Sequence, residues 1–224
     1  MDFPGDTWLV WQLIDSSFPA GSLGHSGGLE AAWQMSGIRV SGGLEEFLHQ
    51  LLENQGASML PLVREAIEGT TPFAELDQLC HVFLVNPPAN QASRQQGRAF
   101  LAAIERGIGL GDCSESLRVK LDRDRGGHLA PVFGWVMRQL QIQPGTAGRM
   151  YLYHQLRGWI SAAVRMNLVG PFEAQRIQLR LSSEAEGVWA RCRSLSLEDM
   201  AQTFPLADLW QMHHPKLYSR LFQS

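Results

Sequence analysis

Residues 41–52, which read SGGLEEFLHQLL, form the stretch that decides the fold. Its apolar side chains recur at positions i, i+3, i+4, i+7 and i+8, which are Leu44, Phe47, Leu48, Leu51 and Leu52. This spacing places one continuous apolar stripe along one face of an α-helix. Ser41 can cap that helix because its hydroxyl can accept a hydrogen bond from a backbone amide of the first turn. The stretch therefore predicts an amphipathic helix that packs against a core.

The same helical period recurs on both sides of this stretch. Upstream, a short helix is predicted for residues 7–14, and a second helix is expected to run from Ser26 to Gly37. Downstream, Thr71 is expected to cap a helix whose first residue is Pro72 and which ends at Asn86. Further helices are predicted for residues 92–104, 129–140, 150–166, 172–181 and 208–214.

Strand patterns are almost missing from the chain. The best extended candidate, residues 81–85, is short and lies within a helical period. We therefore predict an all-α fold, in which residues 1–224 form a single-domain helical bundle of about eight to ten helices. From Pro215 onward, the ten residues 215–224 are fewer than the roughly 12 to 15 that an isolated helix needs. We expect a C-terminal tail that is mobile in the free chain and becomes ordered on a partner.

Composition narrows the class of protein. The 224 residues are 45% hydrophobic and 18% charged, which suits a folded globular chain. The net charge of -3, without a block of Lys and Arg, disfavours nucleic acid and anionic lipid as partners. No apolar run reaches the roughly 18 to 20 residues of a membrane span, and acidic Asp2 and Asp6 stand where a secretory signal is positive. We expect a cytoplasmic protein.

Metal and nucleotide sites have little support in the sequence. The three cysteines form no CxxC pair and are expected to be buried thiols; they are Cys80, Cys113 and Cys192. Most histidines are isolated along the chain, namely His25, His49, His81, His128 and His154, and only His213 and His214 are adjacent. A phosphate-binding loop of the G-x-x-x-x-G-K-[ST] type is missing. We predict no metal site and no bound cofactor.

One pentapeptide matches an enzyme motif. Residues 24–28, GHSGG, fit the G-x-S-x-G elbow that presents a nucleophilic serine in hydrolases. An elbow requires a buried strand before it, whereas Pro19, Ala20 and Gly21 precede this one. In the alternative interpretation the glycines let the chain turn, and Ser26 caps the following helix.

Tryptophan is abundant, with seven residues in the chain. Trp and Arg are enriched at interface anchors, but Trp also fills cores. Four tryptophans lie on apolar helical stripes and are predicted to be core residues; they are Trp8, Trp33, Trp135 and Trp159. For Trp11 and Trp210 both interpretations stay open.

Three stretches, in order along the chain, resemble one known family. The first is residues 13–30, LIDSSFPAGSLGHSGGLE; the second is residues 127–134, GHLAPVFG, with residues 161–165 and Gln175 after it; the third is residues 217–224, LYSRLFQS. Together they resemble the signatures of UreF, a family of urease accessory proteins. The closing SRLFQS is the most specific match.

The resemblance implies an all-α fold, a homodimer, and assembly with UreD (also called UreH) and the GTPase UreG to deliver nickel to apo-urease. In that scheme UreF catalyses no reaction itself. The remaining alternatives are a serine hydrolase built on Ser26 and a generic helical adaptor without a urease partner.

The resemblance also implies site residues. Positions that match the UreG-facing surface are His25, Glu30, Arg165 and Gln175. Positions that match the UreD-binding tail are Tyr218, Ser219, Arg220, Leu221 and Phe222. Glu30 and Arg165 are expected at the surface because charged side chains are seldom fully buried. Leu23 departs from the family, which often has an aromatic residue there, so contact of that ring with the tail arginine is not expected here.

Overall fold

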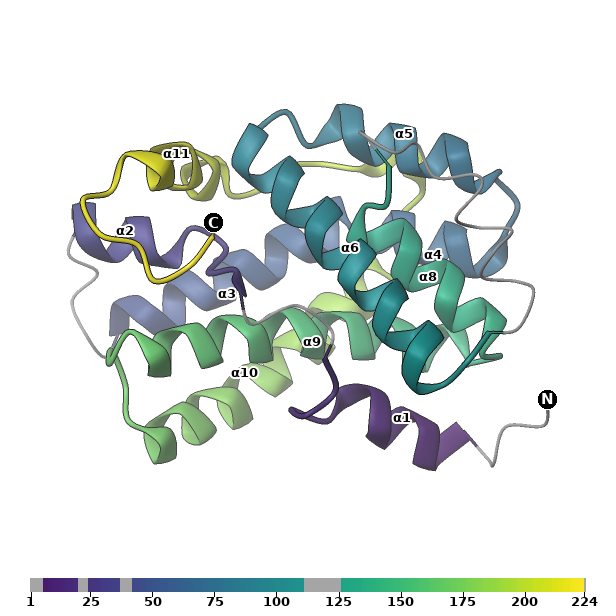
Figure 1. Cartoon of the computed structure of the whole chain (residues 1–224), viewed down its shortest axis with the longest axis horizontal. Coiled ribbons are helices and arrows are strands. Elements are labelled where there is room, and N and C mark those ends of the chain that lie inside the picture. The colour runs from purple at the N-terminus through teal and green to yellow at the C-terminus, as the bar shows by residue number, and fades with distance from the viewer. Residues whose placement is uncertain (1–5, 20–23, 37–41, 111–125, 224) are drawn as a thin grey trace.

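The computed structural model describes residues 6–19, 24–36, 42–110 and 126–223. Within these residues the chain forms ten α-helices and two short 3-10 helices, without a strand (Figure 1). The all-α prediction is therefore confirmed. The α-helices are α1 (Asp6–Ile14), α2 (Leu29–Ser36), α3 (Gly42–Ser58), α4 (Leu60–Glu68), α5 (Phe73–Phe83), α6 (Pro87–Gly107), α8 (Leu129–Gln139), α9 (Pro144–Arg165), α10 (Pro171–Cys192) and α11 (Pro205–His213). The 3-10 helices are η2 (Leu197–Asp199) and η3 (His214–Lys216).

The core forms where long helices cross. α8 packs on α4 and α6, while α10 packs along α9 and α3. α2 and α11 lie together at one end of the molecule, and α1 lies on the outside below α9 (Figure 1). All five apolar residues of the α3 stripe are buried, as predicted. Its expected cap, Ser41, lies outside the described residues, as does Gly37.

Several helix boundaries differ from the predictions because proline starts helices here. Pro61, Pro87 and Pro171 each stand in a first turn, where a residue without an N–H loses no hydrogen bond. The helix predicted for residues 92–104 thus begins at Pro87, and α4 was missed altogether. Pro72 precedes α5 instead of opening it. Thr71 is no cap, since its hydroxyl donates to Glu65 Oε1 at 2.7 Å.

The helix predicted to end at residue 181 continues to Cys192. Leu181, Val188 and Cys192 keep the same buried face, but residues 182–187, SSEAEG, contain no large apolar side chain and interrupt the pattern in the sequence. Cys80 and Cys192 are buried free thiols, as predicted, whereas Cys113 lies outside the described residues.

The tryptophan predictions were partly wrong. Trp159 is buried, and Trp33 and Trp135 are partly buried against the core. Trp8, however, is 70% exposed, and its ring packs edge-on against Trp11 at 5.1 Å between centroids. α1 buries Leu9 and Leu13 instead, so the tryptophans occupy its outer side.

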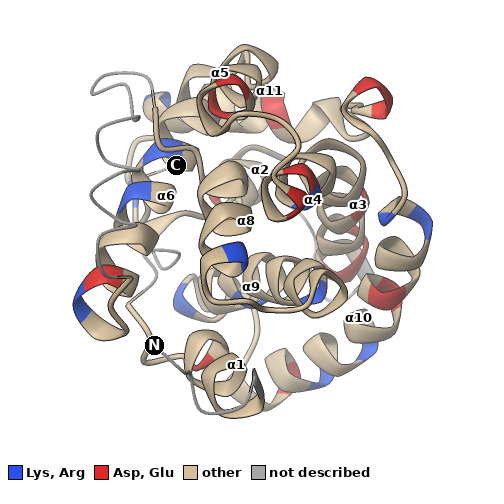
Figure 2. Ribbon diagram, turned by 90° about the vertical axis from the view of Figure 1, so that its right-hand side faces the viewer, with Lys and Arg blue, Asp and Glu red and all other residues tan. Residues whose placement is uncertain are grey.

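Charged residues lie mainly on the outer faces of the helices, and α10 carries charges of both signs (Figure 2). Arg180 on α10 bonds to Glu45 on α3 at 2.9 Å, and Arg191 bonds to Glu53 on α3. Exposed pairs of this type contribute about 0.2 to 1 kcal/mol each. Among the described helices, none combines the length and the apolar character of a membrane span.

Candidate functional site: the docked C-terminal segment

The C-terminal segment, residues 215–223, returns to pack beside α2 (Figure 1). Gln34 Nε2 on α2 donates to the Ser219 carbonyl at 3.1 Å, and Gln223 N donates to the Gly24 carbonyl at 2.9 Å. These contacts place the segment against its own chain, whereas the expected mobility of the free tail and its ordering on a partner stay predictions. A short segment needs no independent helix when its backbone groups find partners on a folded neighbour.

Glu30, in the first turn of α2, is the centre of this contact. Its side chain accepts three hydrogen bonds: from Leu221 N at 2.6 Å, Phe222 N at 3.2 Å and His214 Nε2 at 2.8 Å. The residue is only 3% exposed, so its expected surface position is wrong. A carboxylate can be buried here because three donors replace water, and because the N-terminus of a helix favours negative charge.

Phe222 fills a pocket of its own chain. The residue is 5% exposed, and the Arg165 guanidinium lies 4.6 Å above the ring centroid. A cation over an aromatic face is attracted by the ring quadrupole. Glu30 and Arg165 thus meet around one tail residue, Glu30 at its backbone and Arg165 at its ring. Arg165 itself is exposed, as expected.

The outward side of the segment is a surface of four residues, Tyr218, Ser219, Arg220 and Leu221, named here the C-terminal strip. Tyr218 is fully exposed and Leu221 is half exposed. Gln175 is exposed on α10, where it lines a groove with Trp11 and Arg157. The structure therefore joins the predicted tail residues with Glu30 and Arg165, while Gln175 belongs to a different groove.

Ser26 has the role of a helix cap. Its carbonyl accepts from Leu29 N at 3.2 Å, and its hydroxyl accepts from Glu30 N at 3.4 Å. Gly27 and Gly28 have φ values of 63° and 88°, which glycine adopts without strain. The Ser26 hydroxyl thus accepts from a first-turn amide, as the capping interpretation expects, although Gly28 is the residue directly before α2. Ser26 is fully buried and leads into a helix with no strand among the described residues, so the elbow geometry is missing.

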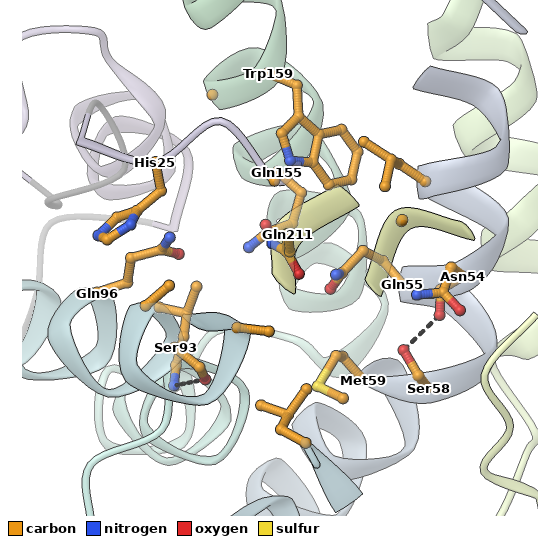
Figure 3. Close-up of a pocket in the computed structure, with 18 of the residues that line it drawn as sticks. His25, Asn54, Gln55, Ser58, Met59, Ser93, Gln96, Gln155, Trp159 and Gln211 are labelled. Atoms are coloured by element: carbon orange, nitrogen blue, oxygen red, sulfur yellow. Dashed lines mark hydrogen bonds between the residues drawn. The ribbon is translucent and has the colours of Figure 1, made fainter. Parts of the chain in front are cut away.

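His25 is buried beside the docked C-terminal segment and lines a pocket of about 110 Å³ (Figure 3). Six carboxamides line it, among them Gln96 of α6, Gln155 of α9 and Gln211 of α11. Burial, and then the charge of His214, lowers the pKa of His25 to about 4.

His154 lines the same pocket, and burial lowers its pKa to about 4 as well, with Arg157 acting in the same direction. Both imidazoles are therefore neutral near pH 7. A wall of carboxamides and neutral imidazoles is suited to ordered water, which can satisfy buried polar groups.

A second polar cluster lies where α5, α6 and α8 meet. Asp77 accepts from Gly127 N and His128 N, both at 2.8 Å. His81 Nδ1 lies 3.3 Å from His128 Nε2, and His128 Nδ1 lies 3.2 Å from Ser93 Oγ. Histidines that are isolated in the sequence are thus paired in space. In the described part of the chain, no three His, Cys, Asp or Glu residues gather as ligands for a metal ion.

The sequence reasoning missed His214, Gln34 and Asp77 as site residues. His214 and Glu30 are separated by 184 positions, and Asp77 and His128 by 51. Residues this far apart in the sequence form no local pattern from which their contact could be predicted. The sequence around a buried acidic residue on a helix has the same spacing as the sequence around an exposed one, so burial of the acidic residue cannot be predicted from it.

Comparison with known proteins assigns the family. A family model described as UreF matches residues 38–182. Urease accessory protein F of Oryza sativa subsp. indica is 34% identical over 219 residues, covering 96% of this chain and 84% of the relative. The protein of the same name from Arabidopsis thaliana is 34% identical, covering 97% and 92%. Urease accessory protein UreF of Trichodesmium erythraeum is 30% identical, covering 95% and 94%. The chain therefore belongs to the UreF family of urease accessory proteins.

Proposed function

We propose that this chain serves urease maturation by binding UreD (UreH) and bringing the GTPase UreG to apo-urease for nickel insertion. The observation that carries this proposal is the C-terminal strip, displayed on a chain whose relatives are named urease accessory proteins. The chain acts as a binding protein and catalyses no reaction. We place it in the cytoplasm, as a single domain that forms a homodimer.

The C-terminal strip is the proposed UreD-binding surface. Tyr218 and Leu221 offer apolar area, and Arg220 offers a planar guanidinium that can form paired hydrogen bonds with a carboxylate. Phe222 supports this surface from behind, since its ring is buried in its own chain.

The UreG-facing surface is assigned to Arg165 and Gln175, which are exposed. Glu30 and His25 are buried, so their proposed contribution to UreG binding is to keep the neighbouring exposed residues in position. A serine hydrolase is not supported, because the Ser26 hydroxyl caps α2 and is inaccessible. The remaining alternative is a generic helical adaptor without a urease partner, and experiment must distinguish it from the proposed function.

The test is co-purification of the full chain with UreD, followed by capture of UreG. We expect Tyr218→Ala and Arg220→Ala together to lower the affinity for UreD at least about tenfold, as for loss of an aromatic and an arginine anchor. Arg193→Ala is the matched control, since Arg193 is an exposed arginine after α10. The absence of a UreD complex with the unmodified chain would overturn the proposal in favour of the adaptor. A monomeric mass measured by light scattering would contradict the proposed homodimer.

A further inference from the structure

We infer that the pocket between α3, α6, α9 and α11 binds a small neutral molecule with a planar amide group, which carries an N–H donor and a C=O acceptor side by side. The pocket has a volume of about 110 Å³ and is lined by residues of all four helices (Figure 3). Because a water takes roughly 30 Å³ in the liquid, there is room for a molecule of about four non-hydrogen atoms. Binding at this pocket does not depend on UreD or UreG as partners, since side chains of this chain line it.

The first support is a set of carboxamides that lack partners in the protein itself. Gln96, Gln155 and Gln211 line the pocket from three different helices, and their side-chain amides form no hydrogen bond with another described residue. Gln202 Oε1 is buried and likewise unpaired within the described part of the chain. Each carboxamide offers two N–H donors and an oxygen that can accept two hydrogen bonds. Buried polar groups are nearly always hydrogen-bonded, so an occupant of the pocket has to supply these partners.

The second support is the polarity of the wall. Tyr151 Oη donates to Gln55 Oε1 at 2.9 Å, and Asn54 Oδ1 accepts from two backbone amides, at 2.8 and 3.2 Å. Both of these carboxamides of α3 therefore keep their NH₂ groups as donors for an occupant. Gln202 instead contributes an unpaired acceptor oxygen. A ligand that pairs with both sides needs a C=O acceptor and an N–H donor, as a primary carboxamide has.

The third support is that the wall favours a neutral ligand. Burial lowers the pKa of His25 and of His154 to about 4, so both imidazoles are uncharged near pH 7. Among the described residues no Lys or Arg lines the pocket, so an anion would lose its hydration without gaining a cation. A cation would find the Asp208 carboxylate, whose pKa is raised by burial and which already accepts from Asn86 Nδ2 at 3.3 Å.

The test is titration of the full-length chain with acetamide, a primary carboxamide of this size, followed by saturation-transfer NMR. We expect saturable binding with a Kd in the millimolar range, because a ligand of this size makes few contacts. Acetate has the same shape with a negative charge, and acetone keeps the acceptor but lacks the N–H donor. Both should bind at least about tenfold more weakly, because they leave polar groups of the pocket unpaired.

Two variants test whether the binding occurs in this pocket. Gln96→Met and Gln155→Met keep an unbranched side chain of similar length but remove the amide, so each should weaken acetamide binding at least about fivefold. The matched control is Gln95→Met, because Gln95 is exposed on the same helix as Gln96 and directly precedes it. It should leave the affinity unchanged. Circular dichroism checks that each variant keeps its helices, and one folded pocket variant is sufficient for the decision.

Several outcomes would overturn the site. No saturable binding of acetamide up to about 100 mM would mean that ordered water alone occupies the pocket. Equal affinity for acetamide, acetate and acetone would mean that amide chemistry is not recognised. Unchanged affinity in the folded pocket variants would place the binding elsewhere on the chain. None of these variants changes the C-terminal strip, so co-purification with UreD tests the proposed function independently.

Discussion

Asp77 on α5 and Glu30 on α2 are both buried carboxylates that accept hydrogen bonds from two adjacent backbone amides of a distant segment. Asp77 binds the amides of Gly127 and His128, and Glu30 binds those of Leu221 and Phe222. Their exposed fractions are 5% and 3%. A histidine lies at each site, His128 at the first and His214 at the second.

The two segments differ in how the chain continues beyond them. After His128 the chain enters α8, which is buried along most of its length between α4 and α6. The residues before Phe222, from 218 to 221, are exposed and enter no helix. The same hydrogen bonds therefore belong to the global fold in one place and to a local closure in the other. The consequence of losing a buried carboxylate depends on whether its donors can reach water without unfolding the core.

The largest expected effect comes from Asp77→Ala. Two buried amides would lose their acceptor, and each unpaired donor costs about 1 to 3 kcal/mol, so the free energy of unfolding should fall by about 2 to 6 kcal/mol. Glu30→Ala should lower it less, because release of the segment exposes the Leu221 and Phe222 amides to water, so that only the buried His214 imidazole loses its acceptor. Urea denaturation followed by circular dichroism measures both. Equal losses would contradict the distinction between a global and a local site.

Acid provides the next test. The folded chain keeps His154 neutral down to its pKa of about 4, whereas the unfolded chain binds a proton near pH 6.5. The unfolded state thus takes up more protons in this window, and stability falls as the pH decreases from 6.5 to 4, by about 3 kcal/mol for this residue. His154→Phe should reduce that loss, measured as free energy of unfolding at pH 7 and pH 4.

His25 has the same lowered pKa but lies beside the docked segment. When His25 is protonated, local release of the segment can expose the charged imidazole to water without unfolding the core. His25→Asn should therefore recover less of the acid-induced loss in free energy of unfolding than His154→Phe does. Identical restoration by the two variants would mean that both regions unfold as one unit.

Substitution of one glycine in each region tests how tightly that region is packed. Gly97 lies against Gly127 near the Asp77 site, and Gly24 lies near Gln223 of the C-terminal segment. A methyl group at Gly97 would lie 2.2 Å from the Gly127 carbonyl oxygen, a contact with backbone that cannot rotate away. Gly97→Ala should cost about 1 to 3 kcal/mol, the usual range for overpacking. At Gly24 the nearest atom would be Gln223 Cδ at 3.9 Å, an ordinary contact. Gly24→Ala is the matched control, and its melting temperature should stay unchanged.

The smallest global effect is expected from Phe222→Ala. Loss of the ring removes the contact with Arg165 and the apolar burial of the segment. The free energy of unfolding should fall by less than the roughly 3 to 5 kcal/mol that is usual for truncating a buried phenylalanine, because the segment can be released without opening the helices. Chymotrypsin should then cleave after Tyr218 faster than in the unmodified chain. A large drop in melting temperature would instead make the segment part of the cooperative core.

The sequence alone was sufficient for the fold class and the family. The 3.6-residue period is a local property, and in residues 44–52 each of the five apolar positions that it marks is buried in the structure. Ser26 as a cap followed from residue type and position, since capping involves neighbours along the chain. The stretches that resemble UreF were likewise readable without coordinates.

The tertiary structure alone decided the state of the charged and titratable groups. Glu30 looks like a surface residue in the sequence, and it is buried only because His214, Leu221 and Phe222 bring donors from the far end of the chain. The pairing of His81 with His128 has the same origin. Helical periodicity records which face of a segment is apolar, whereas the cost of burying a charge depends on partners that only folding brings within hydrogen-bonding distance.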